Sequence, residues 1–188
     1  MSKKILTYKN MILLVLVYVL FVIGISIVAA PQIKYTAYNI ETTELGGVLG
    51  GVYEGRTVSQ EFLYEGTYIQ KVTLMSATYN RKNEGAVVLA LRNSADEVLW
   101  KQEIVSSKIK NDSVLKLQMN KRVTSPDNRY FLDITGVGNH ADNSATFYTT
   151  PASGYQGVIV DSDNNAEQAL YMSIYGRADA GVNWGYLI

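Results

Sequence analysis

The fold of this chain is decided by residues 86–119, which read AVVLALRNSADEVLWKQEIVSSKIKNDSVLKLQM. Successive side chains of a β-strand point to opposite faces, so strictly alternating apolar residues predict a strand with one buried face. The segment 114–119 has this alternation, with the apolar side chains Leu115, Leu117 and Met119 on one face. The segments 86–92 and 98–105 have a similar character, and Asn, Asp and Ser residues typical of turns separate them.

The same pattern continues on both sides of this stretch. Short runs of β-branched and aromatic residues alternate with Asn, Asp, Gly and Ser clusters. These runs predict further strands at 69–79, 129–136, 145–149, 157–161 and 168–176. Beyond the N-terminal segment, no long run has the 3.6-residue period of a helix. We therefore predict an all-β, antiparallel β-sandwich of the jelly-roll type over residues 57–188.

The N-terminal residues differ in character from the rest. Residues 11–30 carry no charge, and a helix of this length would span roughly 30 Å, the thickness of a bilayer core. Three lysines lie within residues 1–10, which predicts a cytoplasmic N-terminus and an extracytoplasmic remainder. We expect a single transmembrane signal anchor in the cell membrane, with a cleaved signal peptide as the alternative. Glycine-rich residues 31–56 predict a stalk or, alternatively, a first strand that joins the sheet late.

The composition excludes several classes of function. The chain has no cysteine, which rules out disulfides, zinc-thiolate sites and a cysteine nucleophile. Residues 31–188 hold 14 of the 17 basic residues and all 17 acidic residues. A mildly acidic domain argues against nucleic acid as a partner, because nucleic acid requires a basic surface.

A series of motifs over residues 57–136 carries a resemblance. A Gln-x-Phe strand (60–62) is followed by Ala-Thr-Tyr-x-Arg-x-Asn-x-Gly (77–85), Val-x-Leu-x-Leu-Arg-Asn (87–93) and Asn-Arg-Tyr-Phe-Leu-Asp-Ile (128–134). This order resembles the jelly-roll, carbohydrate-binding-module-like domains of bacterial cell-surface polysaccharide and glycosyltransferase membrane systems. The resemblance implies a sandwich fold and a binding role. It brings no fixed set of ligand residues.

Catalysis has little support in the sequence. The chain has one histidine, His140, in a polar loop, and no Gly-x-Ser-x-Gly elbow to hold a serine nucleophile. Glycoside hydrolysis needs two carboxyl groups that flank the scissile bond. The acids Asp133 and Glu103 instead fall on the outward faces of predicted strands. We therefore expect no enzyme activity, and a surface glycoside hydrolase is the remote alternative.

One acidic cluster suggests a cation. Asp161, Asp163 and Asn165 place oxygen ligands at alternate positions, as at the start of a calcium loop. The sixth position is Ala166 in place of the turn-making glycine, and the twelfth is Met172 in place of a bidentate glutamate. The segment is therefore either a polar hairpin turn or a site for a structural calcium ion. We expect no other cofactor.

Aromatic side chains are the remaining candidates for a binding site. Apolar faces of sugars stack on aromatic rings, and the best platforms in this sequence are Trp100, Tyr171, Tyr175 and Trp184. Tyr171 and Tyr175 share the less apolar face of their predicted strand. Trp100 is in phase with Ile104, which favours a place in the core. Paired tyrosines also cover sheet surfaces or pack on other proteins.

These observations predict a non-catalytic binding or accessory domain. The first hypothesis is glycan binding in a cell-envelope system, with the domain held at the membrane by residues 11–30. The alternative is a structural subunit of a membrane or cell-surface assembly, which contacts other proteins through its Tyr-rich face.

Overall fold

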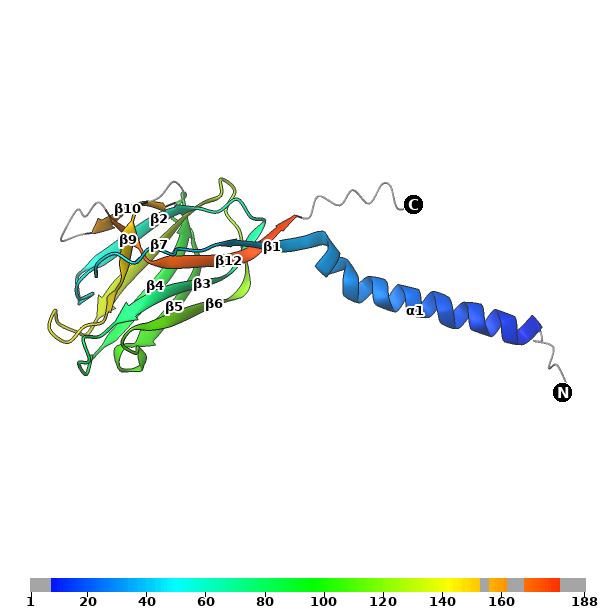
Figure 1. Ribbon diagram of the computed structural model, residues 1–188, viewed down its shortest axis with the longest axis horizontal. Helices are drawn as coiled ribbons and strands as arrows, with labels where there is room; N and C mark the ends of the chain where they lie inside the picture. The colour runs from blue at the N-terminus through cyan, green and yellow to red at the C-terminus, as the bar shows by residue number, and fades with distance from the viewer. Residues whose placement is uncertain (1–7, 153–155, 162–167, 180–188) are drawn as a thin grey trace. The chain divides into compact units, whose positions relative to one another are not determined.

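The computed structural model describes residues 8–152, 156–161 and 168–179 (Figure 1). It divides into two compact units. One contains the helix α1 (Tyr8–Lys34), and the other, Ala37–Ala178, contains the sheets.

The helix corrects one prediction. Among the described residues, no helix is both long and apolar enough to cross a membrane. The predicted fold class, a sandwich preceded by a transmembrane helix over residues 11–30, is therefore wrong in its helical part.

The sheet-forming part of the chain follows the predicted strands closely. The segment predicted at 98–105 is a strand with the same bounds, and the one predicted at 86–92 is longer by one residue. The described strands are β1 (Tyr35–Ile40), β2 (Thr57–Leu63), β3 (Tyr68–Ala77), β4 (Ala86–Asn93), β5 (Val98–Val105), β6 (Ser113–Val123), β7 (Arg129–Val137), β8 (Thr146–Phe147), β9 (Thr149–Pro151), β10 (Gln156–Asp161), β11 (Gln168–Leu170) and β12 (Met172–Asp179), with a 3₁₀ turn η1 (Ser106–Lys108) after β5.

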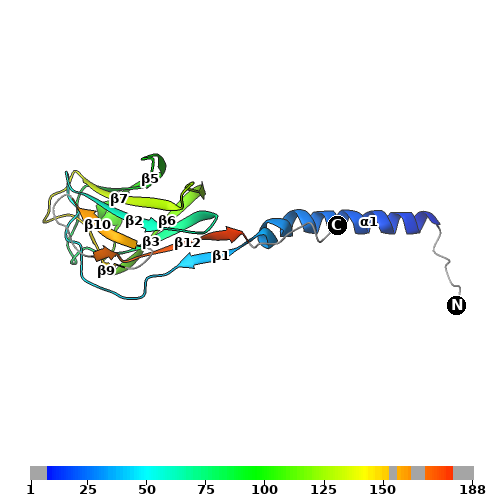
Figure 2. The same cartoon turned by 90° about the horizontal axis from the view of Figure 1, so that it is seen from above.

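The strands form two layers, which Figure 2 shows from above. The first sheet has the order β1-β12-β3-β6, with β8 also paired to β3, and the second has the order β10-β2-β7-β4-β5. Strands β12, β3 and β6 pair antiparallel with one another in this order, as do β10, β2, β7, β4 and β5. Strands β9 and β11 form a small third sheet. The predicted antiparallel sandwich is thus confirmed, and its jelly-roll type stays a prediction.

The core lies between the two main sheets and follows the period-2 pattern. Side chains that alternate along β4, β7 and β6 are buried together with those of β2, β3 and β12. Burial of apolar surface is the main stabilising contribution of such a layer. The fully buried members include Val87, Leu89, Leu91, Leu132, Ile134, Leu117, Met172 and Ile174.

Residues 31–56, predicted as a stalk or a late first strand, lie mostly in the sheet-forming unit. Strand β1 is a neighbour of β12 in the first sheet. Farther along, Val48 forms an isolated bridge with Tyr148, and Val52 is fully buried in the core. Apolar residues between the glycines thus reach the sandwich, and the glycines allow the chain to approach it closely. A Cβ on Gly46, for example, would lie 2.9 Å from the Thr149 carbonyl oxygen.

Candidate functional site

The outer face of β12, β3 and β6 is the candidate site. Its side chains form three rows that cross the strands in register: Tyr175, Lys71 and Gln118; Ser173, Thr73 and Lys116; Tyr171, Met75 and Val114. Because side chains alternate along a strand, residues two apart share this face. The predicted common face of Tyr171 and Tyr175 therefore exists, with Ser173 between them.

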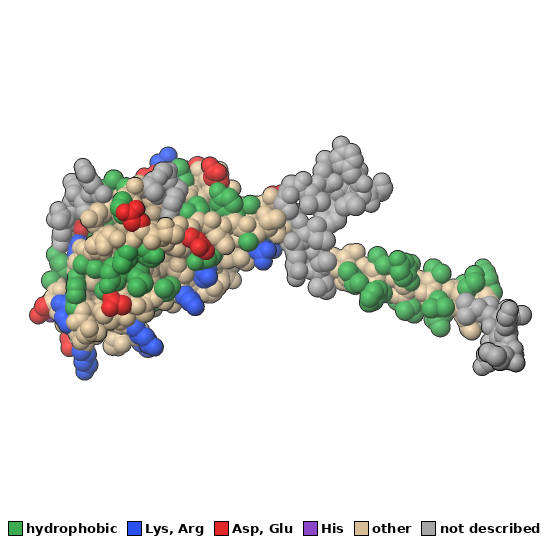
Figure 3. Space-filling model, in the orientation of Figure 1, with side chains coloured by type: hydrophobic (Ala, Val, Ile, Leu, Met, Phe, Trp, Pro, Cys, Tyr) green, Lys and Arg blue, Asp and Glu red, His purple; other side chains and the backbone are tan. Residues whose placement is uncertain are grey.

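This face is hollowed into a groove of about 280 Å³. Its floor consists of Thr73, Met75 and Ser173, and residues Glu41 and Thr42 border it on the β1 side. Figure 3 views the molecule from this side, and hydrophobic side chains gather near the start of β12 with acidic and basic groups around them. Such a mixture of apolar surface and hydrogen-bonding groups is typical of ligand sites.

Tyr171 is held in place by its main chain. It lies between β11 and β12, where its N–H donates to the Tyr148 carbonyl at 2.8 Å. Its own carbonyl accepts from the Met75 N–H at 3.2 Å. These bonds fix the backbone and leave the half-buried ring at the edge of the groove. Such a ring can serve as a preorganised platform for an apolar ligand face.

Tyr175 has a different environment. The Lys71 ammonium lies 3.7 Å from the centroid of its ring, a cation–π contact between paired strands. One face of this ring is therefore already covered by Lys71, so Tyr171 is the more accessible platform. Lys116 is exposed at the opposite side of the groove, where it adds a positive charge.

The two predicted tryptophan platforms differ in outcome. Trp100 is 8% exposed and belongs to the core cluster, as its phase with Ile104 indicated. Its edge lines a separate hollow of about 360 Å³ with polar side chains of β5 and β6, among them Gln102 and Gln118. Trp184 lies outside the described residues, so its role as a platform stays a prediction.

The predicted calcium ligands are only partly described. Asp163 and Asn165 lie outside the described residues. Asp161 is buried, and its carboxylate accepts two hydrogen bonds from Arg56, at 3.1 Å from Nε to Oδ1 and 2.5 Å from Nη2 to Oδ2. A calcium ion at Asp161 would therefore compete with a guanidinium. Among the described residues, no three His, Cys, Asp or Glu side chains are placed to hold a metal, and the calcium site stays a prediction.

The outer face of the second sheet contrasts with the groove. Asp133, on β7, accepts hydrogen bonds from Ser59 at 2.6 Å and from Arg92 at 2.7 Å. The Arg92 guanidinium also lies 4.3 Å from the centroid of the Phe131 ring. These polar and aromatic groups pair with one another across the strands. The first sheet therefore has the better-formed site of the two outer faces.

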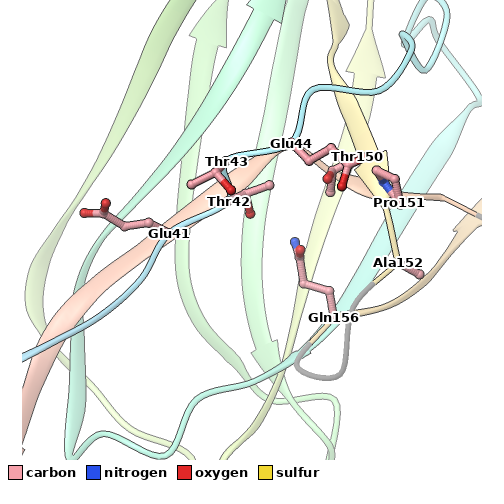
Figure 4. A pocket seen from close by; sticks show the side chains of 8 residues that line it. All are labelled: Glu41, Thr42, Thr43, Glu44, Thr150, Pro151, Ala152 and Gln156. Atoms are coloured by element: carbon pink, nitrogen blue, oxygen red, sulfur yellow. The ribbon is translucent and has the colours of Figure 1, made fainter.

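A second hollow, of about 240 Å³, lies beside the groove and was not predicted from the sequence (Figure 4). It lies between residues 41–44 on one side and residues 150–152 and Gln156 on the other, and it shares Glu41 and Thr42 with the groove. No sequence pattern relates these two segments, since tertiary packing alone brings them together. The one local signal was a polar Gln156 at the start of a strand.

The segment 41–44 is fixed to β12 by its main chain and one side chain. The Thr42 N–H donates to Ser173 Oγ at 3.3 Å, and Thr42 Oγ1 donates to the Met172 carbonyl at 2.5 Å. Both hollows therefore share a wall that is tied to the strand carrying Tyr175.

No protein-family model matches this chain, and no curated protein matches it significantly.

Proposed function

We propose that the sandwich is a non-catalytic glycan-binding domain that acts in a cell envelope and uses the groove over β12, β3 and β6. The observation that carries this proposal is the half-buried ring of Tyr171 at the edge of a groove floored by Ser173 and Thr73. Sugars present both apolar faces and hydroxyl groups. An aromatic platform beside hydroxyl and ammonium side chains matches both kinds of surface.

The arrangement of acids supports the non-catalytic part. A glycosidase places two carboxyl groups on either side of the scissile bond. The described groove is bordered by one carboxylate, Glu41, and Figure 4 shows its side chain pointing away from that of Glu44. The loop residue His140 uses its backbone N–H to bond the Asn143 side chain at 2.7 Å. It does not line the groove.

Binding of polysaccharides by the full-length protein tests this proposal. The exposed apolar side chains of α1, such as Leu13 and Phe21, call for a non-ionic detergent. It must lack a sugar head group, because a maltoside would compete for the site. We expect at least one neutral or charged envelope polysaccharide to bind in calorimetry. Tyr171→Ala should weaken that binding about tenfold or more, as expected for loss of a central aromatic anchor.

Phe131→Ala is the matched control. Phe131 is also a half-buried, outward-facing aromatic residue, but it lies on the second sheet. We expect this variant to retain binding, and thermal unfolding should verify that both variants are folded. Equal losses in the two variants, or no binding of any polysaccharide, would contradict the proposal. Stoichiometric co-purification of a protein that Tyr171→Ala releases would favour the structural-subunit alternative.

A further inference from the structure

Strand β5 forms one edge of the second sheet. Among the described strands it pairs with β4 alone, at the end of the order β10-β2-β7-β4-β5. Its central residues Lys101, Gln102 and Glu103 are all exposed. An edge strand presents a row of unpaired backbone N–H and C=O groups, and another strand can add to that row.

A hydrogen bond at the end of β5 shows which backbone groups face this edge. The Ser106 N–H donates to the Gly85 carbonyl at 2.9 Å, and this pair extends the register of β4 and β5 by one position. Backbone groups alternate in direction along an antiparallel strand, so those of Gln102 also point toward β4. The backbone groups of Lys101 and Glu103 therefore point away from β4 and are available to a second strand.

The charges on this edge are not paired across β4. Lys101 and Glu103 lie opposite Ala90 and Val88, and neither charge forms an ion pair with the described part of the chain. The two charges are two residues apart, so they share one face of the strand. Such a pair is complementary to an antiparallel copy of itself.

We propose that two copies of this chain associate by antiparallel pairing of their β5 strands, about a twofold axis at Gln102. In this register, Lys101 of each copy lies opposite Glu103 of the other. The backbone groups of these residues are the ones directed at the partner strand. The next pair along the strand joins Trp100, a member of the core, to the half-buried Ile104 of the other copy.

The backbone and the charges together select this register. An axis at Lys101 or at Glu103 would place like charges directly opposite each other, which destabilises a strand pair. An axis between two residues would place outward backbone groups opposite groups that β4 already uses. The remaining contact is isologous and closes on itself, so two copies complete it.

Strand β6, which forms an edge of the first sheet, lacks this complementarity. It carries three cations, Lys116, Lys121 and Arg122, and its sequence from Ser113 to Val123 contains no acidic residue. Lysines on an edge strand are a common means of preventing the addition of another strand. An antiparallel copy of β6 would supply no acid to these cations, so β5 is the self-complementary edge of the two.

Charge reversal in the full-length protein tests the proposal. Sedimentation equilibrium in a non-ionic detergent, at several ratios of protein to detergent, should show a dimer for the wild type. Lys101→Glu and Glu103→Lys each create two like-charged pairs across the axis, and each should raise the dimer Kd about tenfold or more. Both side chains are exposed, so folding should be preserved, and thermal unfolding verifies it.

Two complementation experiments make the test specific. The double variant Lys101→Glu/Glu103→Lys restores opposite charges in the same register and should dimerise like the wild type. An equimolar mixture of the two single variants should form heterodimers, because the acidic edge of one meets the basic edge of the other. Lys121→Glu, which reverses an exposed lysine on β6, is the matched control and should leave the dimer Kd unchanged.

A cysteine at the axis tests the register directly. The natural chain has no cysteine. Gln102 would face its own copy in a non-hydrogen-bonded pair, where Cα atoms are about 4.5 Å apart, within the range of a disulfide. Gln102→Cys should therefore give a covalent dimer on mild oxidation, whereas Asn120→Cys, exposed on β6, should not.

Several results would overturn the inference. One is a wild type that stays monomeric at every concentration. Another is a dimer that both charge reversals leave intact, because the association is then carried by another surface, such as the apolar side chains of α1. Losses that neither the double variant nor the mixture restores would exclude this register. The inference does not rest on glycan binding, since Tyr171 lies at the groove over the first sheet.

Discussion

The buried ion pair between Arg56 and Asp161 allows a quantitative prediction. Their side chains are 7% and 3% exposed. The guanidinium also donates to the carbonyls of Gly51 at 2.5 Å and Leu49 at 3.1 Å. One side chain thus joins the chain before β2 to the end of β10.

We expect Asp161→Asn to destabilise the protein by about 3 kcal/mol. Removal of one partner of a buried pair costs about 3–5 kcal/mol, because the other charge stays buried without compensation. The lower end of this energy range applies here, because Arg56 keeps its two carbonyl partners. The amide oxygen of the new asparagine can also still accept one hydrogen bond. For a domain of this size, the loss corresponds to roughly 10 °C in melting temperature.

The assay is unfolding by urea and by heat, monitored by circular dichroism, with and without a calcium chelator. The control is Glu61→Gln, which breaks the exposed pair with Arg129 and should cost less than about 1 kcal/mol. A loss of stability below 1 kcal/mol for Asp161→Asn would refute the reasoning. If instead the chelator destabilised the wild type as much as the substitution does, Asp161 would be a calcium ligand.

Two further predictions concern packing and pH. Gly176→Ala should destabilise the protein by about 2 kcal/mol in urea unfolding, since a Cβ there would lie 2.2 Å from the Tyr68 carbonyl oxygen and 2.3 Å from the Tyr64 hydroxyl. Ala178→Gly, on the same strand, is the control. An unchanged unfolding midpoint for Gly176→Ala would contradict this packing. Hydrogen bonds from Ser94 and Ser125 lower the pKa of Asp127 to about 2. The ionised carboxylate therefore stabilises the fold above its ordinary pKa near 3.8, and this contribution is lost as the pH falls toward 2. Melting temperatures measured between pH 5 and 2 should fall less steeply in Asp127→Asn than in the wild type, and parallel curves would contradict the assignment.

The sequence predicted what depends on local periodicity. The alternation in 114–119 and 129–136 determined which residues are buried, and the phase of Trp100 with Ile104 correctly indicated the core. The same rule placed Tyr171 and Tyr175 on one face. It needs only the two-residue period of a strand, which every neighbouring residue reinforces.

Contacts between distant segments were not predictable in this way. Arg56 and Asp161 are separated by 105 positions, and no periodic pattern relates them. The Asp-rich pattern at Asp161 indicated oxygen ligands for a cation, and a guanidinium occupies that carboxylate. Residues 41–44 meet Gln156 only because the chain after β1 follows β12, a consequence of how the first sheet is ordered.

Under the proposed glycan binding, the wall shared by the two hollows would let both of them contact one ligand. Thr42 is bonded to Met172 and Ser173, which adjoin Tyr171 along the chain, so the aromatic platform and the second hollow are attached to the same few residues of β12. A glycan held at Tyr171 would present its next residues to the second hollow at a high effective concentration. Weak contacts at each hollow would then combine into useful affinity, since the second contact adds little entropic cost. This arrangement suits a polymer with several sugar units better than a single sugar.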